Sequence, residues 1–150
     1  MPQSLARVHQ HLIFSTKGRT PVLDGAVRNS LHNYMAVVLR NLDCPAELIN
    51  SVEDHVHILF ELGRTVTYSK AVEEVKKTSS KWIKTVGPQY AKFAWQAGYG
   101  IFSVSASRVV TVREYIANQR AHHRRQSFQD EFRSFLKRHR VAYDERYIWD

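Results

Sequence analysis

Two histidines that are one residue apart are the first side chains of the sequence with an evident use in chemistry. His55 and His57 flank Val56, and Ile58 and Phe60 follow. Side chains alternate across a β-strand, so the two imidazoles share one face and the three apolar residues share the other. Packing of the apolar face on a core holds the imidazoles side by side. Neutral imidazole is a common ligand of divalent metals, so this spacing suits two ligands of one ion.

A second pair of histidines has the same spacing and gives an internal comparison. His9 and His11 flank Gln10, and Leu12 and Phe14 continue the face of Gln10. The polar middle residue makes this pair a weaker candidate for a metal site, and a supporting role for either histidine stays open. A bare His-x-His is more often a pair of solvent-facing or locally hydrogen-bonded strand residues. The spacing therefore needs a nucleophile and a third ligand beside it.

A tyrosine and a glutamine supply those two groups on one predicted helix. The helix extends from Val109 to Arg124, and its apolar stripe includes Val112 and Ile116. Tyr115 lies at the flank of the stripe, with Gln119 one turn further on. A phenol is a competent nucleophile for phosphoryl transfer, and an amide oxygen can be presented to the same point. A tyrosine on a helix flank is nevertheless more often a packing residue than a catalytic one.

The charge balance favours a polyanionic partner. The 150 residues include 22 Lys and Arg against 14 Asp and Glu, a formal net charge of +8. Nucleic acid is the first candidate. An anionic membrane surface ranks lower, because no basic helix has a bulky exposed apolar face and no apolar run is long enough to span a bilayer. The single cysteine, Cys44, excludes an internal disulfide and predicts a reducing, cytoplasmic location, with association to the nucleoid when DNA is bound.

The periodicity predicts one α/β domain over residues 1–150, with 126–150 as a C-terminal extension. Alternating patterns predict strands, longer apolar stripes predict helices, and Gly and Pro mark the turns between them. The predicted strands are 7–15, 46–51, 55–62 and 100–105, and the predicted helices are 26–41, 68–86, 109–124 and 128–138. The order βαββαβ followed by helices predicts a ferredoxin-like α+β sandwich with an antiparallel sheet. One sheet face would pack on helices, and the other would be free to carry a site.

Several strings in the same order resemble the single-tyrosine HUH transposases of small insertion sequences, of the insertion-sequence-200 type. They cover nearly the whole chain: His11–Lys17 with Arg19, Asp54–His57, Trp95–Gly100, Phe102–Ser105, Tyr115–Gln119, His122-His123, Phe128–Phe132 and Tyr143–Asp150. Such a series is far more specific than any His-x-His. The related repeat-associated tyrosine transposases are a close subgroup, and membership of that subgroup stays open.

The resemblance implies a reaction and a set of roles. Tyr115 matches the nucleophile, which would take a 5′-phosphate of single-stranded DNA and leave a 3′-OH. His55, His57 and Gln119 match the ligands of Mg²⁺ or Mn²⁺. The family further implies hairpin ends of a mobile element as the DNA, and a homodimer in which the tyrosine helix can serve the partner's histidines. Assembly in cis or in trans stays open. No general base is identified, with His122, His123 and a water as equal candidates.

Basic residues outside this set are predicted to contact DNA. They are Lys17 and Arg19 in the first loop, Lys70, Lys77, Lys81 and Lys84 on one stripe of the helix 68–86, and Arg113 and Arg120 on the tyrosine helix. A solvated basic face explains the lysine stripe equally well. Trp95 and Tyr99 suit either base stacking or, more often, core packing. Phe128, Phe132 and Phe135 are spaced for a packed helix face.

Three other functions are compatible with the same residues. A nicking nuclease or replication initiator uses the same nick-and-join chemistry, but the short chain without a helicase domain favours a transposase. A ferredoxin-like RNA- or DNA-binding module without catalysis would keep all of its activity when the Tyr115 hydroxyl is removed. A domesticated regulator that binds hairpins without moving DNA has the same sequence features.

Overall fold

Four antiparallel strands form one sheet in the computed structural model, which describes residues 2–123 and 125–150. The strands β1 (His9–Ser15), β2 (Ala46–Ser51), β3 (His55–Glu61) and β4 (Gly100–Val104) lie in the order β2-β3-β1-β4. Helix α1 (Gly25–Asn41) connects β1 to β2, and α2 (Tyr68–Ile83) connects β3 to β4. This is the ferredoxin-like βαββαβ arrangement that the sequence predicts.

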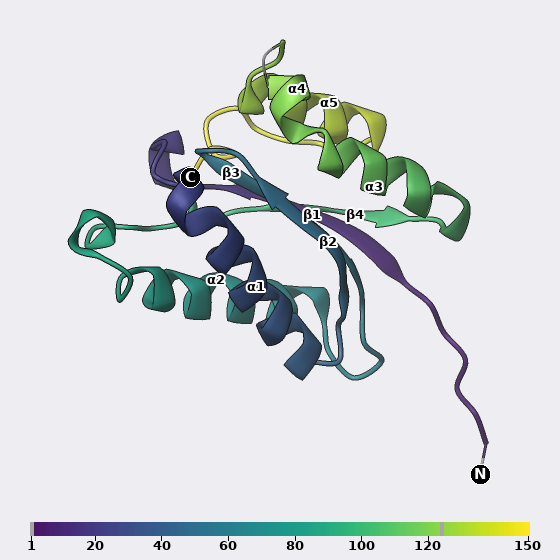
Figure 1. Cartoon of the computed structure of the whole chain (residues 1–150). Coiled ribbons are helices and arrows are strands. Elements are labelled where there is room, and N and C mark those ends of the chain that lie inside the picture. Colours follow the sequence, from purple (N-terminus) through teal and green to yellow (C-terminus); the bar gives the residue numbers. More distant parts are fainter. Residues whose placement is uncertain (1, 124) are drawn as a thin grey trace.

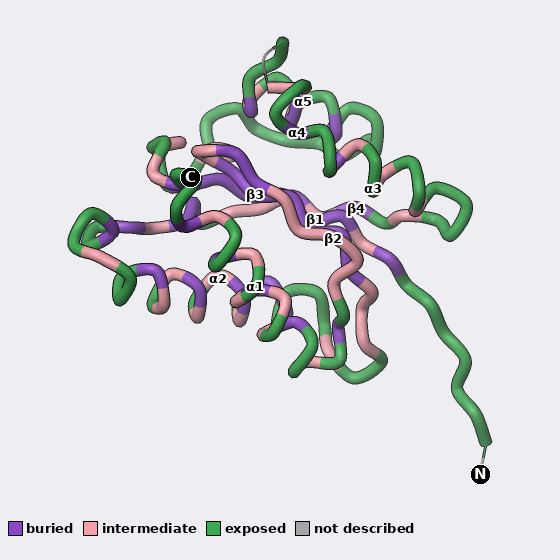
Figure 2. Tube along the Cα trace, in the orientation of Figure 1, coloured by how far each residue is buried: buried purple, intermediate pink, exposed green. Residues whose placement is uncertain are grey.

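The apolar face of the central strands packs against α1 and α2 on one side of the sheet (Figure 1). Phe14 of β1 and Val56, Ile58 and Phe60 of β3 are fully buried there. Figure 2 shows that buried residues are concentrated in β1 and β3, the two strands with a neighbour on each side. Asp24 caps α1, since its side chain accepts a hydrogen bond from the Val27 amide.

The opposite face is covered by a third layer, so the prediction of a free face is wrong. This layer consists of α3 (Val109–Ala117), α4 (Gln119–His123) and α5 (Phe128–Arg138) (Figure 1). The predicted apolar face of α5 packs with Ile13 and Phe102 of the sheet. Gly100 permits the close approach of α5, because a Cβ at this position would lie 2.5 Å from the Phe132 ring. We call α3, α4 and α5 together the outer layer.

The predicted helix over 109–124 is two helices separated at Asn118, and Arg124 lies outside the described residues. The Asn118 side chain donates a 3.0 Å hydrogen bond to the Glu114 carbonyl, and its backbone leaves the helical range with ψ at 26°. Asn side chains compete in this way for helix carbonyls. The Asn50 side chain of β2 also donates to the Ile116 carbonyl at 2.8 Å. The break leaves Gln119 fully buried.

The other boundaries shift by a few residues, with β1 beginning at His9 and α2 ending at Ile83. After α5 the chain returns along one end of the sheet, where the Gly98 amide donates to the Asp150 carbonyl at 2.8 Å. Trp149 packs there on Phe128 and Phe132. Among the described residues, no helix is both long and apolar enough to cross a membrane.

A partly buried histidine on α1 makes the stability of the fold depend on pH. One ring nitrogen of His32 lies 2.7 Å from the Ser51 hydroxyl, and burial, reinforced by Arg28, lowers the pKa of His32 to about 4. The unfolded chain takes up this proton near pH 6.5, so the contribution is complete above pH 6.5 and is lost as pH falls through 4. Between pH 7.5 and pH 4 we expect the wild type to lose about 3 kcal/mol more unfolding free energy than His32→Gln.

Urea unfolding of both proteins at several pH values measures this difference. Comparison with the variant removes the contributions of the other titrating groups, which the two proteins share. Parallel pH profiles for the two proteins would contradict the prediction.

Candidate active site

The outer layer places the predicted tyrosine and glutamine above the two histidines of β3. His55 and His57 point away from the α1–α2 core, and both side chains are fully buried. The rings of Tyr115 and His57 lie 6.1 Å apart between centroids, and Gln119 follows on α4. The structure therefore brings together all four residues to which the sequence assigns chemistry.

Two residues that the sequence did not assign as ligands complete a compact cluster of ligand atoms. His55 Nε2 lies 2.9 Å from His123 Nε2 on α4. Glu131 Oε1 on α5 lies 3.0 Å from His57 Nε2, 3.2 Å from His123 Nε2 and 3.5 Å from His55 Nε2. One ligand atom from each of these four residues lies within 4.8 Å of the other three. Three imidazoles and a carboxylate at such distances can hold one divalent ion.

Gln119 lies at the edge of this cluster. Its side-chain oxygen is 3.0 Å from His123 Nε2, and its amide nitrogen donates to the Tyr115 carbonyl at 3.4 Å. The oxygen faces the histidines and is fully buried. It is thus placed to serve as the further ligand that the resemblance implies.

The Tyr115 hydroxyl donates a hydrogen bond to Glu131 Oε2. The tyrosine ring stacks on His122 with centroids 4.3 Å apart and meets Phe135 edge to face. Burial and the negative charge of Glu131 raise the pKa of Tyr115, so the phenol is protonated at neutral pH. Ionisation of this phenol therefore requires positive charge beside Glu131 and an acceptor for the proton.

Glu131 joins Tyr115 to the ligand cluster. Burial opposes its ionisation, but the charge of His57 and the hydrogen bonds of the surrounding histidines outweigh burial and hold the pKa of Glu131 well below its usual range. The carboxylate is therefore ionised, with Oε2 at Tyr115 and Oε1 at the histidines. Glu131 thus accepts the hydrogen bond of the Tyr115 hydroxyl, a contact that the sequence did not identify.

The second ring nitrogen of each β3 histidine has its own partner. His55 Nδ1 lies 2.7 Å from the Asp54 carboxylate, and His57 Nδ1 lies 2.8 Å from His11 Nε2. Burial, with the charge of His57, lowers the pKa of His11 well below its ordinary value, so His11 is neutral. Partners on Nδ1 leave Nε2 of both rings facing the cluster, as metal-binding histidines require.

The residues missed from the sequence differ in the signal that they carry. Glu131 lies three residues after Phe128 and four before Phe135, so it occupies the apolar face of an amphipathic helix. A carboxylate on such a face needs a partner and could have been singled out. His123 is adjacent to His122, and His11 is one residue apart from His9. Only the fold shows which histidine of each pair faces the cluster.

The basic stripe of α2 lies across the sheet from the tyrosine. Glu74 pairs with both Lys70 and Lys77 at 3.1 Å, while Lys81 and Lys84 are exposed. Arg113 and Arg120 belong to the outer layer, and Arg120 pairs with Glu53 at 3.3 Å. The predicted DNA-contacting residues are thus distributed over both faces of the molecule.

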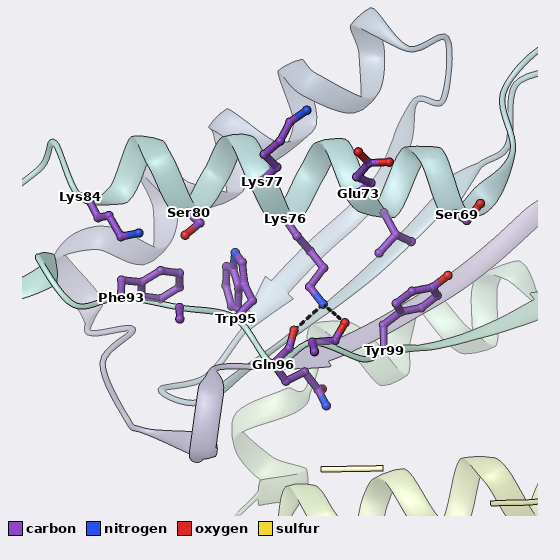
Figure 3. Close-up of a pocket in the computed structure, with 13 residues that line it drawn as sticks. Ser69, Glu73, Lys76, Lys77, Ser80, Lys84, Phe93, Trp95, Gln96 and Tyr99 are labelled. Atoms are coloured by element: carbon purple, nitrogen blue, oxygen red, sulfur yellow. Dashed lines mark hydrogen bonds between the residues drawn. The ribbon is translucent and has the colours of Figure 1, made fainter. Parts of the chain in front are cut away.

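A groove of about 550 Å³ lies beside α2, with Lys76, Lys77 and Lys84 along one wall and Tyr99 at one end (Figure 3). Lys76 donates to the Gln96 and Gly98 carbonyls at 2.6 and 2.9 Å and so fixes this segment. Trp95 is buried, meets Phe14 edge to face and donates to the Ser79 hydroxyl at 3.0 Å. Trp95 is therefore a packing residue.

Solved structures with this fold include two transposases. A candidate transposase from Deinococcus radiodurans R1 superposes with a TM-score of 0.62 at 21% identity, covering 79% of this chain and 98% of the other. A REP-associated tyrosine transposase bound to a REP hairpin superposes with a TM-score of 0.61 at 12% identity, covering 82% and 73%. A comparison with curated proteins gives no match.

The family described as "Transposase IS200 like" matches residues 4–119 of this sequence. The matched range contains His55, His57, Tyr115 and Gln119, whereas His123 and Glu131 lie beyond it. The match spans well over half of the chain, which therefore belongs to the IS200-like transposase family.

Proposed function

We propose that the protein is a metal-dependent transposase that cuts and rejoins single-stranded DNA through a tyrosine–phosphate bond. The observation that carries this proposal is the bridge made by Glu131. One of its carboxylate oxygens accepts the Tyr115 hydroxyl, and the other faces three histidines. A nucleophile, a proton acceptor and a set of metal ligands thus meet in one buried place.

The donor set fits a divalent ion. Three imidazole nitrogens, a Glu131 oxygen and the Gln119 oxygen give mixed nitrogen and oxygen ligation. Mg²⁺ strongly prefers oxygen and water, so this set favours Mn²⁺ of the two predicted ions. When bound, the ion would offset the charge on a phosphoryl oxygen and on Glu131.

The chain's own groups account for the transfer of atoms. The Tyr115 proton moves to Glu131 Oε2 as the phenol oxygen forms a bond to phosphorus. The bond between phosphorus and the 3′-oxygen of the preceding nucleotide breaks, and that oxygen takes a proton from Glu131 to become a 3′-OH. Attack by another 3′-OH on the phosphotyrosine reverses these steps and rejoins the strands. The bond energy is kept in the phosphotyrosine, so no nucleotide cofactor is consumed.

The DNA is proposed to be a hairpin end of a mobile element. This rests on the family and on the shared fold with a REP-associated transposase that is bound to a REP hairpin. The net charge of +8 supports a nucleic-acid partner. Because the Tyr115 hydroxyl donates a hydrogen bond to Glu131 of its own chain, we propose that each active site is assembled in cis, from one chain. The homodimer stays a prediction.

A cleavage assay tests the proposed function. The protein is mixed with end-labelled single-stranded oligonucleotides from the flanks of its gene, with Mn²⁺, with Mg²⁺ or with EDTA, and is resolved on a denaturing gel. We expect a covalent protein–DNA adduct that requires the ion. Tight hairpin binding without a covalent adduct in either Mn²⁺ or Mg²⁺ would overturn the proposed transposase activity and favour a non-catalytic hairpin-binding module.

Loss of the His11 side chain is expected to weaken metal binding. His11 holds Nδ1 of His57 at 2.8 Å, and partners of this kind fix ring orientation and tautomer. We expect His11→Ala to lower Mn²⁺ affinity about 10–100-fold and His11→Gln, which keeps an acceptor, to restore part of it. Titration of free Mn²⁺ by electron paramagnetic resonance measures both.

His9→Ala is the matched control for His11→Ala. His9 is a buried histidine on the same face of β1, but its nearest charged partner is Glu47, at 3.8 Å. His9, Glu47 and Glu61 form a separate group of ligand atoms, and we expect His9→Ala to leave Mn²⁺ binding at the His55–His57 cluster as it is in the wild type. Equal affinities for His11→Ala and His9→Ala would show that His11 does not position His57.

A further inference from the structure

A cavity of about 570 Å³ lies at the end of the sheet near the C-terminal residues. The first loop contributes Lys17 and Arg19, and Trp95, Trp149 and Asp150 line other parts of its wall. A space of this size accommodates a nucleotide. The cavity shares Ala94, Trp95 and Ala97 with the groove beside α2, and none of the metal-cluster residues line it.

One nitrogen of Arg19 is buried in this region without a hydrogen-bond partner. Among residues 2–123 and 125–150, no group accepts a hydrogen bond from Arg19 Nη1. A buried donor without an acceptor is costly, and a charged one especially so. The guanidinium lies over the Trp149 ring at 5.8 Å, which satisfies none of its N–H groups. An anion would supply the missing acceptor, and the oxygens of a phosphate match the paired N–H donors of a guanidinium.

The loop places Arg19 at some cost to its backbone. Gly18 and Arg19 both have positive φ, at 63° and 58°, a region that non-glycine residues rarely adopt. The Thr16 hydroxyl donates to the Thr20 carbonyl at 2.8 Å and closes the loop across its base. The loop thus holds an arginine in an unfavourable conformation beside a cavity.

Direct contacts connect this cavity to the active site. The Thr16 amide, at the start of the loop, donates to the Asp54 carbonyl at 2.8 Å, and Asp54 holds His55. On the other side, Trp149 packs on Phe128, and the Phe128 ring lies 4.8 Å from the His55 ring. One layer of side chains therefore separates the cavity from the cluster.

We infer that this cavity binds one nucleotide of the single strand close to the phosphodiester that Tyr115 attacks. Its phosphate would lie at Arg19 and Lys17, and its sugar or base against the exposed part of the Trp149 indole. Asp150 on the wall limits the site to one phosphate, because a second negative group would face it. This inference rests on the proposed function, since it takes single-stranded DNA as the ligand.

Salt-dependent binding tests the phosphate contact. The full chain is titrated with a fluorescein-labelled single-stranded oligonucleotide that spans the cleavage site, at several salt concentrations. We expect Arg19→Gln to raise Kd about tenfold and to reduce the slope of log K against log[salt] by about 0.7, the value for one phosphate contact on a single strand. Arg19→Lys should keep the slope, because it keeps the charge.

Arg40→Gln provides the matched control, since Arg40 is exposed at the end of α1 and does not line the cavity. It should leave Kd and slope unchanged. An Arg19→Gln protein with the wild-type slope would overturn the inference, even if its Kd rose, because such a loss is not electrostatic. Melting temperature and Mn²⁺ affinity confirm that Arg19→Gln is folded.

Tryptophan fluorescence tests the second contact and the identity of the ligand. We expect the oligonucleotide to quench tryptophan emission in the wild type and in the control variant Trp82→Phe. In the wild type Trp82 stacks on Tyr34, in the α1–α2 layer. Quenching should be largely lost in Trp149→Phe, because Trp95, the other tryptophan on the cavity wall, is buried. Equal quenching by inorganic phosphate would show that the cavity binds a free anion and would overturn the inference that it binds a nucleotide. Absence of a covalent adduct would instead overturn the proposed reaction and leave these binding results intact.

Discussion

Tyr115→Phe is expected to abolish the covalent adduct, with a loss of at least about a thousandfold in the rate of strand cleavage. The substitution removes only the hydroxyl, which is the atom that bonds to phosphorus. The ring keeps its stacking on His122 and its edge contact with Phe135. We therefore expect the fold, hairpin affinity and Mn²⁺ affinity to be preserved. A denaturing gel with labelled oligonucleotide measures the adduct.

Tyr99→Phe is the matched control for this substitution. Tyr99 is half-buried beside the α2 groove and belongs to the other side of the sheet. Its hydroxyl is not part of the active site, so Tyr99→Phe should form the adduct at the wild-type rate. An adduct that persisted in Tyr115→Phe would assign the nucleophile to another residue.

Glu131→Gln is expected to reduce the cleavage rate at least about a hundredfold, even when the divalent ion is saturating. Glutamine has the same shape, but it is neutral and does not take up the Tyr115 proton. The substitution also removes one ligand charge, so Mn²⁺ affinity should fall as well. Single-turnover rates at several Mn²⁺ concentrations separate the two effects, because only the loss of a ligand is corrected by more ion.

Asp130→Asn gives a control on the neighbouring carboxylate. The Asp130 side chain is 65% exposed and pairs with Arg133, away from the cluster. It should cleave and bind Mn²⁺ as the wild type does. If Glu131→Gln recovered the full rate at saturating Mn²⁺, Glu131 would be a ligand only, and the proton acceptor would have to be sought elsewhere.

The sequence predicts the part of the site that depends on local spacing. His55 and His57 share a face because strand side chains alternate, and Val56 and Ile58 determine that this face points away from the core. Tyr115 and Gln119 follow from their separation on a predicted helix, although that helix is broken at Asn118, between the two residues. Their meeting with the histidines was expected from the family resemblance.

The remainder of the site depends on how distant segments pack. Periodicity shows that Phe128 and Phe132 lie on a buried face of α5, but it does not say which surface buries them. The sheet face that was expected to be free is that surface. Glu131 reaches the histidines through this contact, at a separation of 74 residues from His57. Its partners could not be predicted without the position of the outer layer.

Complete burial of His55, His57 and Gln119 has a consequence for how DNA is accepted. We expect a phosphate to reach these groups in conformations in which the outer layer has shifted from the sheet. The apparent affinity for DNA is then the intrinsic affinity reduced by the population of such conformations. Each apolar contact that stabilises the docked outer layer lowers this population. Stronger packing among Phe102, Phe128, Phe132 and Phe135 would therefore order the active site better and would also make it less accessible to the DNA strand.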